Sequence, residues 1–188
     1  MKMPNFSRFY RLHWIGASSL NFFKLSLTGL LLSCLTPWSA LAVPRSDQGS
    51  LNGFAQLSSA VSQNPGGFVQ FELKDTVQRV QTTQDSVTTN QGGNYLIVAS
   101  PQVTATKDGG CVDAWIVLNE QDVKNSGVRL CQSKAGNTNV VVSQSIMSLR
   151  KGDKIQVRTS GKDVKLDAIK PQKGPLIPSI IFTVVQID

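Results

Sequence analysis

Short apolar runs alternate with polar residues along most of the chain after residue 67. The runs are rich in Val, Ile, Thr and Phe, and Gly, Asn, Asp and Pro separate them at the spacing typical of a β-sandwich or barrel. No long amphipathic pattern interrupts them, so parallel βαβ units are not expected. We predict strands at residues 68–73, 75–82, 95–99, 102–106, 112–118, 128–131, 140–149, 154–159, 164–169 and 179–187.

A polar segment at residues 43–67 precedes these strands. Its apolar residues recur at steps of three and four, namely Leu51, Phe54, Leu57 and Val61. This spacing predicts a short amphipathic helix over about residues 50–62. Because so short a helix is marginal alone, we expect it to pack on its own domain or on other copies of the chain.

Residues 1–42 have the pattern of a secretory signal. Basic residues without any acidic one precede an apolar run at residues 25–35, and Ala40-Leu41-Ala42 is the small-x-small sequence that signal peptidase reads. We predict cleavage after Ala42 and a secreted, periplasmic or extracellular protein. The mature chain would then have no transmembrane segment, and would comprise a linker with the short helix at residues 43–67 and one β-sandwich domain at residues 68–188.

Two alternatives are open for the leader. Leu31-Leu32-Ser33-Cys34 resembles a lipoprotein cleavage box, although apolar residues follow Cys34 where a polar tether is expected. An uncleaved anchor would use residues 25–42, which are shorter than the about 20 apolar residues that a spanning helix needs.

Two cysteines, Cys111 and Cys131, lie in the mature chain. An even number in an exported protein predicts one structural disulfide, whereas a redox-active pair would have C-x-x-C spacing. If the cysteines face each other in an antiparallel hairpin, the register places Asp113 opposite Arg129 on the same face.

The last predicted strand is apolar on both faces over residues 180–185. Such a strand needs cover on both sides, so it is expected in the centre of a sheet or at a subunit interface.

Four segments resemble the globular heads of complement C1q-like proteins. They are Gly92-Gly93-Asn94-Tyr95-Leu96-Ile97-Val98, Val117-Leu118-Asn119-Glu120, Ser148-Leu149-Arg150-Lys151-Gly152-Asp153-Lys154-Ile155-Gln156-Val157, and Ile181-Phe182-Thr183-Val184-Val185. The resemblance spans residues 68–188. It implies a jelly-roll-like β-sandwich of about ten strands related to tumour necrosis factor, commonly assembled as a trimer and used for recognition rather than chemistry.

Catalytic chemistry has few candidate residues. The only histidine, His13, lies in the leader, so the mature domain lacks the usual general base and the commonest zinc ligand. A carboxylate pair is the remaining hydrolytic option, but the acidic side chains sit mostly at turns, where charged residues are usually solvated: Glu72, Asp75, Asp108, Asp113, Glu120 and Asp122. We predict no enzyme and no cofactor.

Calcium has two candidate segments, Asp108-Gly109-Gly110 and Asn119-Glu120-Gln121-Asp122. Neither has the alternating ligand spacing of a calcium loop, and such residues are also ordinary turn formers. We predict no metal site.

Positive charge is concentrated late in the chain. The leader holds four of the 19 basic residues and none of the 12 acidic ones, so the mature chain has a net charge of only +3. Residues 150–173 hold eight Lys or Arg against three Asp. We predict that an anionic carbohydrate, such as a surface polysaccharide, binds a basic face made by Lys151, Lys154, Arg158, Lys162 and Lys165.

The alternative for these residues is a solvated face on which lysines protect an edge strand. Nucleic acid is not expected, because few aromatic residues accompany the charges. The sequence therefore predicts a secreted, non-enzymatic recognition domain. A structural or assembly protein of the cell envelope or extracellular matrix, a homotrimer built through its C-terminal strand, is the alternative.

Overall fold

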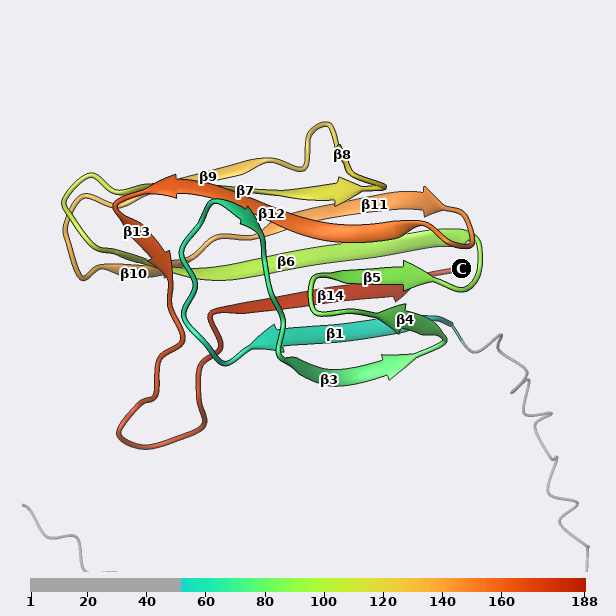
Figure 1. The fold of residues 1–188 in the computed structure, drawn as a ribbon, viewed down its shortest axis with the longest axis horizontal. Coiled ribbons are helices and arrows are strands. Elements are labelled where there is room, and N and C mark those ends of the chain that lie inside the picture. Colours follow the sequence, from blue (N-terminus) through green and yellow to red (C-terminus); the bar gives the residue numbers. More distant parts are fainter. Residues whose placement is uncertain (1–51) are drawn as a thin grey trace, which may run out of the picture. The chain divides into compact units, whose positions relative to one another are not determined.

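The computed structural model describes residues 52–188, and every regular element in them is a β-strand (Figure 1). The strands are β1 (Phe54–Ser59), β2 (Gly67–Phe68), β3 (Leu73–Gln78), β4 (Val80–Thr82), β5 (Ser86–Thr89), β6 (Gly93–Ala105), β7 (Cys111–Leu118), β8 (Gln121–Asp122), β9 (Val128–Cys131), β10 (Thr138–Val140), β11 (Ser143–Leu149), β12 (Lys154–Lys162), β13 (Val164–Leu166) and β14 (Ile180–Gln186). Among these residues no helix offers a membrane-crossing segment. The leader and its cleavage site lie outside them.

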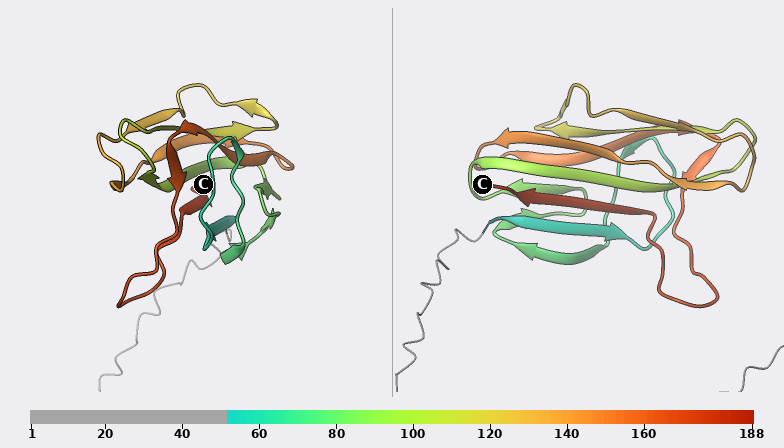
Figure 2. Two further views of the ribbon diagram at one scale, coloured as in Figure 1. Left: turned by 60° about the vertical axis from the view of Figure 1, so that its left-hand side comes forward. Right: turned by 180° about the vertical axis from the view of Figure 1, so that it is seen from behind.

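Two antiparallel sheets form the fold (Figure 2). The β14 sheet has the order β10-β6-β14-β1-β3, and β11 and β13 also pair with β6. The β12 sheet has the order β4-β5-β12-β7-β8, and β2 and β9 pair with β12 and β7. This arrangement confirms the predicted all-β fold and is consistent with a jelly-roll-like sandwich. The segment between β13 and β14 projects away from both sheets (Figure 1).

The core lies between the sheets because apolar side chains alternate along each strand. On β14 the inward residues Ile180, Phe182 and Val184 are fully buried. Ile155 and Val157 of β12 are equally buried in the same cluster. Phe182 stacks on Phe71 with ring centroids 5.4 Å apart.

The predicted helix over residues 50–62 is wrong. Residues 50 and 51 lie outside the described part of the chain, but Phe54–Ser59 form β1, which pairs with both β14 and β3. Ala55 and Leu57 face the core, being 1% and 0% exposed. Apolar residues spaced three and four apart are compatible with a helix. Hydrogen bonding of this segment to a strand on each side favours a strand instead. The sandwich therefore begins with β1, before the predicted boundary at residue 68.

Other strand boundaries also differ from the prediction. The strands predicted at residues 95–99 and 102–106 are one strand, β6, which runs through Pro101. Its first half pairs with β11 and β14, and its last residues pair with β10 and β13. Pro101 has no N–H to donate to the sheet, but its carbonyl oxygen accepts a hydrogen bond from the Val141 backbone N–H at 3.1 Å.

The cysteine prediction is confirmed together with its register. Cys111 is disulfide-bonded to Cys131, directly opposite it in the antiparallel pair of β7 and β9. Asp113 lies opposite Arg129 and accepts hydrogen bonds from its Nε at 2.7 Å and its Nη2 at 2.9 Å.

The last strand, β14, is central in its sheet, as predicted. It lies between β6 and β1 along its whole length (Figure 1).

Candidate functional site on the outer faces of the sheets

Strand β12 places a polar stripe on the outer face of its sheet. Lys154, Gln156 and Arg158 alternate with the core residues Ile155 and Val157, as the sequence predicts. Lys154 and Arg158 are half-buried, and Gln156 is 1% exposed.

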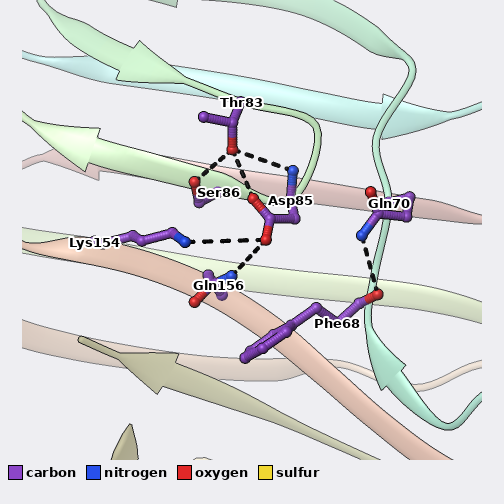
Figure 3. Close-up of polar contacts among 7 residues, drawn as sticks. All are labelled: Phe68, Gln70, Thr83, Asp85, Ser86, Lys154 and Gln156. Atoms are coloured by element: carbon purple, nitrogen blue, oxygen red, sulfur yellow. Dashed lines mark hydrogen bonds and ion pairs between the residues drawn. The ribbon is translucent and has the colours of Figure 1, made fainter. Parts of the chain in front are cut away.

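A hydrogen-bonded cluster around Asp85 occupies one end of this stripe (Figure 3). The Asp85 carboxylate accepts hydrogen bonds from the Thr83 hydroxyl and the Gln156 Nε2, both at 2.7 Å. Lys154 Nζ lies 4.0 Å from the same carboxylate. The cluster joins the turn between β4 and β5 to β12, so it holds two neighbouring strands together.

The charge of Asp85 follows from these partners. Burial raises the pKa of the Asp85 carboxyl, but the Thr83 hydrogen bond and the positive charge of Lys154 outweigh burial and hold that pKa below its ordinary value. Asp85 is therefore ionised at neutral pH and neutralises Lys154.

Arg158 lies in the middle of the stripe between an aromatic ring and a carboxylate. Its guanidinium carbon lies 4.4 Å from the centroid of the Phe68 ring, and Nη1 lies 3.5 Å from Asp122 Oδ1. Trp115 of β7 is opposite Arg158 in register, and its indole Nε1 donates to the same Asp122 oxygen at 2.7 Å. These contacts fix the planes of both the guanidinium and the indole.

A hollow of about 570 Å³ opens beside Trp115 and Asp122, and we call it the Trp115 hollow. Strands β7, β8, β9 and β12 and the loop between β8 and β9 contribute its walls. Its polar and aromatic lining comprises Asp113, Trp115, Asp122, Asn125, Arg129 and Ser160.

The five predicted basic residues do not form one uniform patch. Lys151, in the turn before β12, and Lys162, at the end of β12, are exposed, and no ion pair in residues 52–188 involves them. Lys154 and Arg158 are paired with carboxylates as described above. Lys165 lies on β13 in the β14 sheet, where its Nζ is 2.9 Å from Asp167.

The carboxylates considered for chemistry are mostly engaged in structural contacts. Asp113 and Asp122 line the same hollow. The hydrogen bond from Arg129 holds the pKa of Asp113 below its ordinary value, so this carboxyl is not a proton donor at neutral pH. Asp108 accepts a hydrogen bond from the Ala135 backbone N–H at 2.8 Å. No group of three or more His, Cys, Asp or Glu within residues 52–188 is arranged to hold a metal ion.

The outer face of the β14 sheet has a different chemistry. Ile146, Leu96, Val185 and Phe54 lie side by side in register across β11, β6, β14 and β1. Ile146 is 67% exposed and Ile181, further along β14, is 37% exposed. The outward positions of these four strands carry no charged residue.

Sequence reasoning found the basic stripe but missed the residues that neutralise it. Asp85 lies in the turn between β4 and β5 and Asp122 lies on β8, both distant from β12 in sequence, and no local pattern signals their contacts with it. The alternation that places Asp113 and Trp115 on one face of β7 was visible, and it was the available signal for the Trp115 hollow. Comparison of the chain with protein-family models and with characterised proteins finds no match to either.

Proposed function

We propose that this chain is an exported, non-enzymatic recognition domain that binds an anionic carbohydrate on the outer face of the β12 sheet. The observation that carries the proposal is the concentration of charge on the outer face of the β12 sheet, compared with four strands of the other sheet. The outer face of the β12 sheet bears Lys154, Arg158, Lys162 and Arg129 with three carboxylates, whereas the outward positions of β11, β6, β14 and β1 bear no charge.

The binding site would centre on the side chains that have no carboxylate partner. Lys151 and Lys162 are exposed at the two ends of β12 and retain their full positive charge for a ligand. Arg158, between them, still has a guanidinium edge beyond its single contact with Asp122. A linear polyanion laid along β12 would meet all three cations.

The leader pattern supports export. Two features support recognition rather than catalysis. The resemblance to complement C1q-like heads implies binding without chemistry. The carboxylates of the Trp115 hollow are committed to Arg129, Arg158 and the indole of Trp115. A hydrolytic pair would need one protonated carboxyl, and the hydrogen bond from Arg129 holds the pKa of Asp113 below its ordinary value.

The first test measures binding to heparin, a soluble anionic polysaccharide. We expect the exported protein to bind at low salt, and Lys151→Ala/Lys162→Ala to bind ~10-fold more weakly, because two unpaired cations are lost. Salt-gradient elution from heparin and a glycan array measure this effect.

The matched control is Lys74→Ala/Lys134→Ala, which removes the same charge from β3 and from the loop between β9 and β10. If both double variants lose equal affinity, binding depends on net charge and not on this face. If the protein binds neither heparin nor any anionic glycan of the array at low salt, an anionic carbohydrate is excluded as the ligand.

A second function is favoured by the apolar row on the β14 sheet. We infer that the chain assembles into a homotrimer through this face, as a structural component of the cell envelope or extracellular matrix. The four apolar side chains lie in register on four strands whose outward positions carry no charge, and burial against other copies would cover them. The proposed number of three subunits comes from the resemblance to complement C1q-like heads. Assembly and recognition are compatible, because they use opposite sheets.

Light scattering tests this assembly. We expect a mass three times that of one chain for the exported protein and a monomer for Leu96→Asp, because the substitution places a charge in the middle of the apolar row. Thr88→Asp, which adds the same charge on β5 of the other sheet, should stay trimeric. A monomeric wild-type protein at high concentration would disprove this assembly.

A further inference from the structure

The Trp115 hollow carries an inference that extends the proposed function and rests on it. We propose that this hollow is a subsite for one uncharged pyranose ring of the bound carbohydrate. The ligand class is therefore an acidic oligosaccharide or polysaccharide in which a neutral sugar adjoins the charged group.

Trp115 supplies the apolar platform of the subsite. The indole is half-buried on the outer face of β7 and lines the hollow. Its Nε1–H is bonded to Asp122 at 2.7 Å, which fixes the ring before a ligand arrives. A pyranose ring has an apolar face of C–H groups, so stacking on an indole removes apolar surface from water on both partners.

The polar walls match the hydroxyl groups at the edge of a sugar. Asp113, Asp122 and Arg129 line the hollow from three strands, and Asn125 and Ser160 add an amide and a hydroxyl. Asp113 and Arg129 are paired with each other through the Arg129 Nε and Nη2, so a sugar hydroxyl would meet the remaining lone pairs of Asp113 and the remaining N–H groups of Arg129. The amide of Asn125 can both donate to and accept from a hydroxyl group. A few such polar groups around an aromatic surface are typical of small-ligand sites of this volume.

The loop between β8 and β9 is held in place from inside. Ser126 is 1% exposed, and its Oγ accepts the Ile116 N–H at 3.0 Å and donates to the Val123 carbonyl oxygen at 2.9 Å. Ser143 Oγ donates to the Ser126 carbonyl oxygen at 2.6 Å. The loop wall is therefore formed in advance, and little ordering is needed when a ligand binds.

The subsite adjoins the basic stripe of the proposed function. Arg158 is opposite Trp115 in register and contacts Asp122, which also lines the hollow. A sugar in the hollow would thus direct a neighbouring sulfate or carboxylate toward Arg158. This geometry connects the neutral and the anionic parts of one ligand.

Intrinsic fluorescence tests the subsite directly. The substitutions Trp14→Phe and Trp38→Phe leave Trp115 as the single tryptophan of the chain, whether or not the leader is cleaved. The probes are the methyl glycosides of glucose, galactose, mannose and N-acetylglucosamine at millimolar concentrations. We expect a saturable change in tryptophan emission with at least one of them, and no change with any of the four would overturn the inference.

A substitution then locates the binding. By calorimetry with a glycoside that responds, Trp115→Ala should bind at least ~10-fold more weakly, because the stacking surface is lost. Phe68→Ala is the matched control, since it removes an aromatic ring of the same sheet face that does not line the hollow. Equal affinity of Trp115→Ala and the parent protein would place the sugar elsewhere and refute the subsite.

Heparin elution separates this inference from the proposed function. Heparin binding without a glycoside response refutes the subsite alone. A glycoside response without heparin binding refutes the anionic ligand and leaves the subsite supported.

Discussion

Phe182→Ala is expected to lower the free energy of unfolding by about 3–5 kcal/mol, as truncation of a fully buried phenylalanine does. Phe182 is 0% exposed on the central strand of its sheet. Leu57 of β1 and Ala99 of β6 flank it in register, and Phe71 stacks on its ring. Small neighbours such as Ala99 cannot fill the space, so a cavity should persist.

Urea unfolding followed by circular dichroism measures this loss. The control is Val140→Ala on β10, where the side chain is 55% exposed and the expected change is within about 0.5 kcal/mol. Equal urea midpoints for Phe182→Ala and Val140→Ala would mean that the centre of the sandwich is not packed as described.

The strands that sequence reasoning located best are those with strict alternation and a clear turn at each end. Cys111–Leu118 was predicted to within one residue, and the facing of its side chains was also predictable. The start of β12 at Lys154 was predicted too, but the strand extends to Lys162, three residues beyond the predicted end. Strand β1 was missed because Leu57 and Val61 also fit helical spacing. What decides its structure is pairing with β14, more than 100 residues later in the chain, and a local pattern contains no information on that pairing.

The candidate site was also predictable only in part. Alternation predicted which side chains lie on the outer face of β12, but it did not predict the carboxylates and amides that they contact. Gln156 and Asp85 are 71 residues apart in sequence and Arg158 and Asp122 are 36 apart, yet each pair is in contact. These contacts reduce the free positive charge of the face and leave Lys151 and Lys162 as its unpaired cations. The sequence therefore predicted the location of the face better than its electrostatics.

The two sheet faces suggest a division of roles. A charged face with an aromatic hollow favours contact with water, whereas an apolar row on four strands without outward charges favours burial. If copies associate through the β14 sheet, the β12 faces point outward and several ligand sites are displayed together. Weak binding at each site would then sum to strong binding of a repetitive polysaccharide.

Cys111→Ser/Cys131→Ser is expected to lower the free energy of unfolding by about 3 kcal/mol. The disulfide joins residues separated by 20 positions, and the chain-entropy model attributes about this stabilisation to closing such a loop in the unfolded state. The folded structure should persist, because the ion pair of Asp113 with Arg129 holds the register of β7 and β9.

Urea unfolding with and without a reducing agent checks the disulfide. Reduction should shift the midpoint of the parent protein to that of the double variant and leave the variant unchanged. Since β9 pairs with β7 alone among the described strands and carries Arg129 in the wall of the Trp115 hollow, glycoside affinity should also fall in the double variant. If the midpoints of the oxidised and reduced parent protein coincide, the bridge does not stabilise the fold. The ion pair and the pairing of β9 with β7 would then suffice to hold that wall.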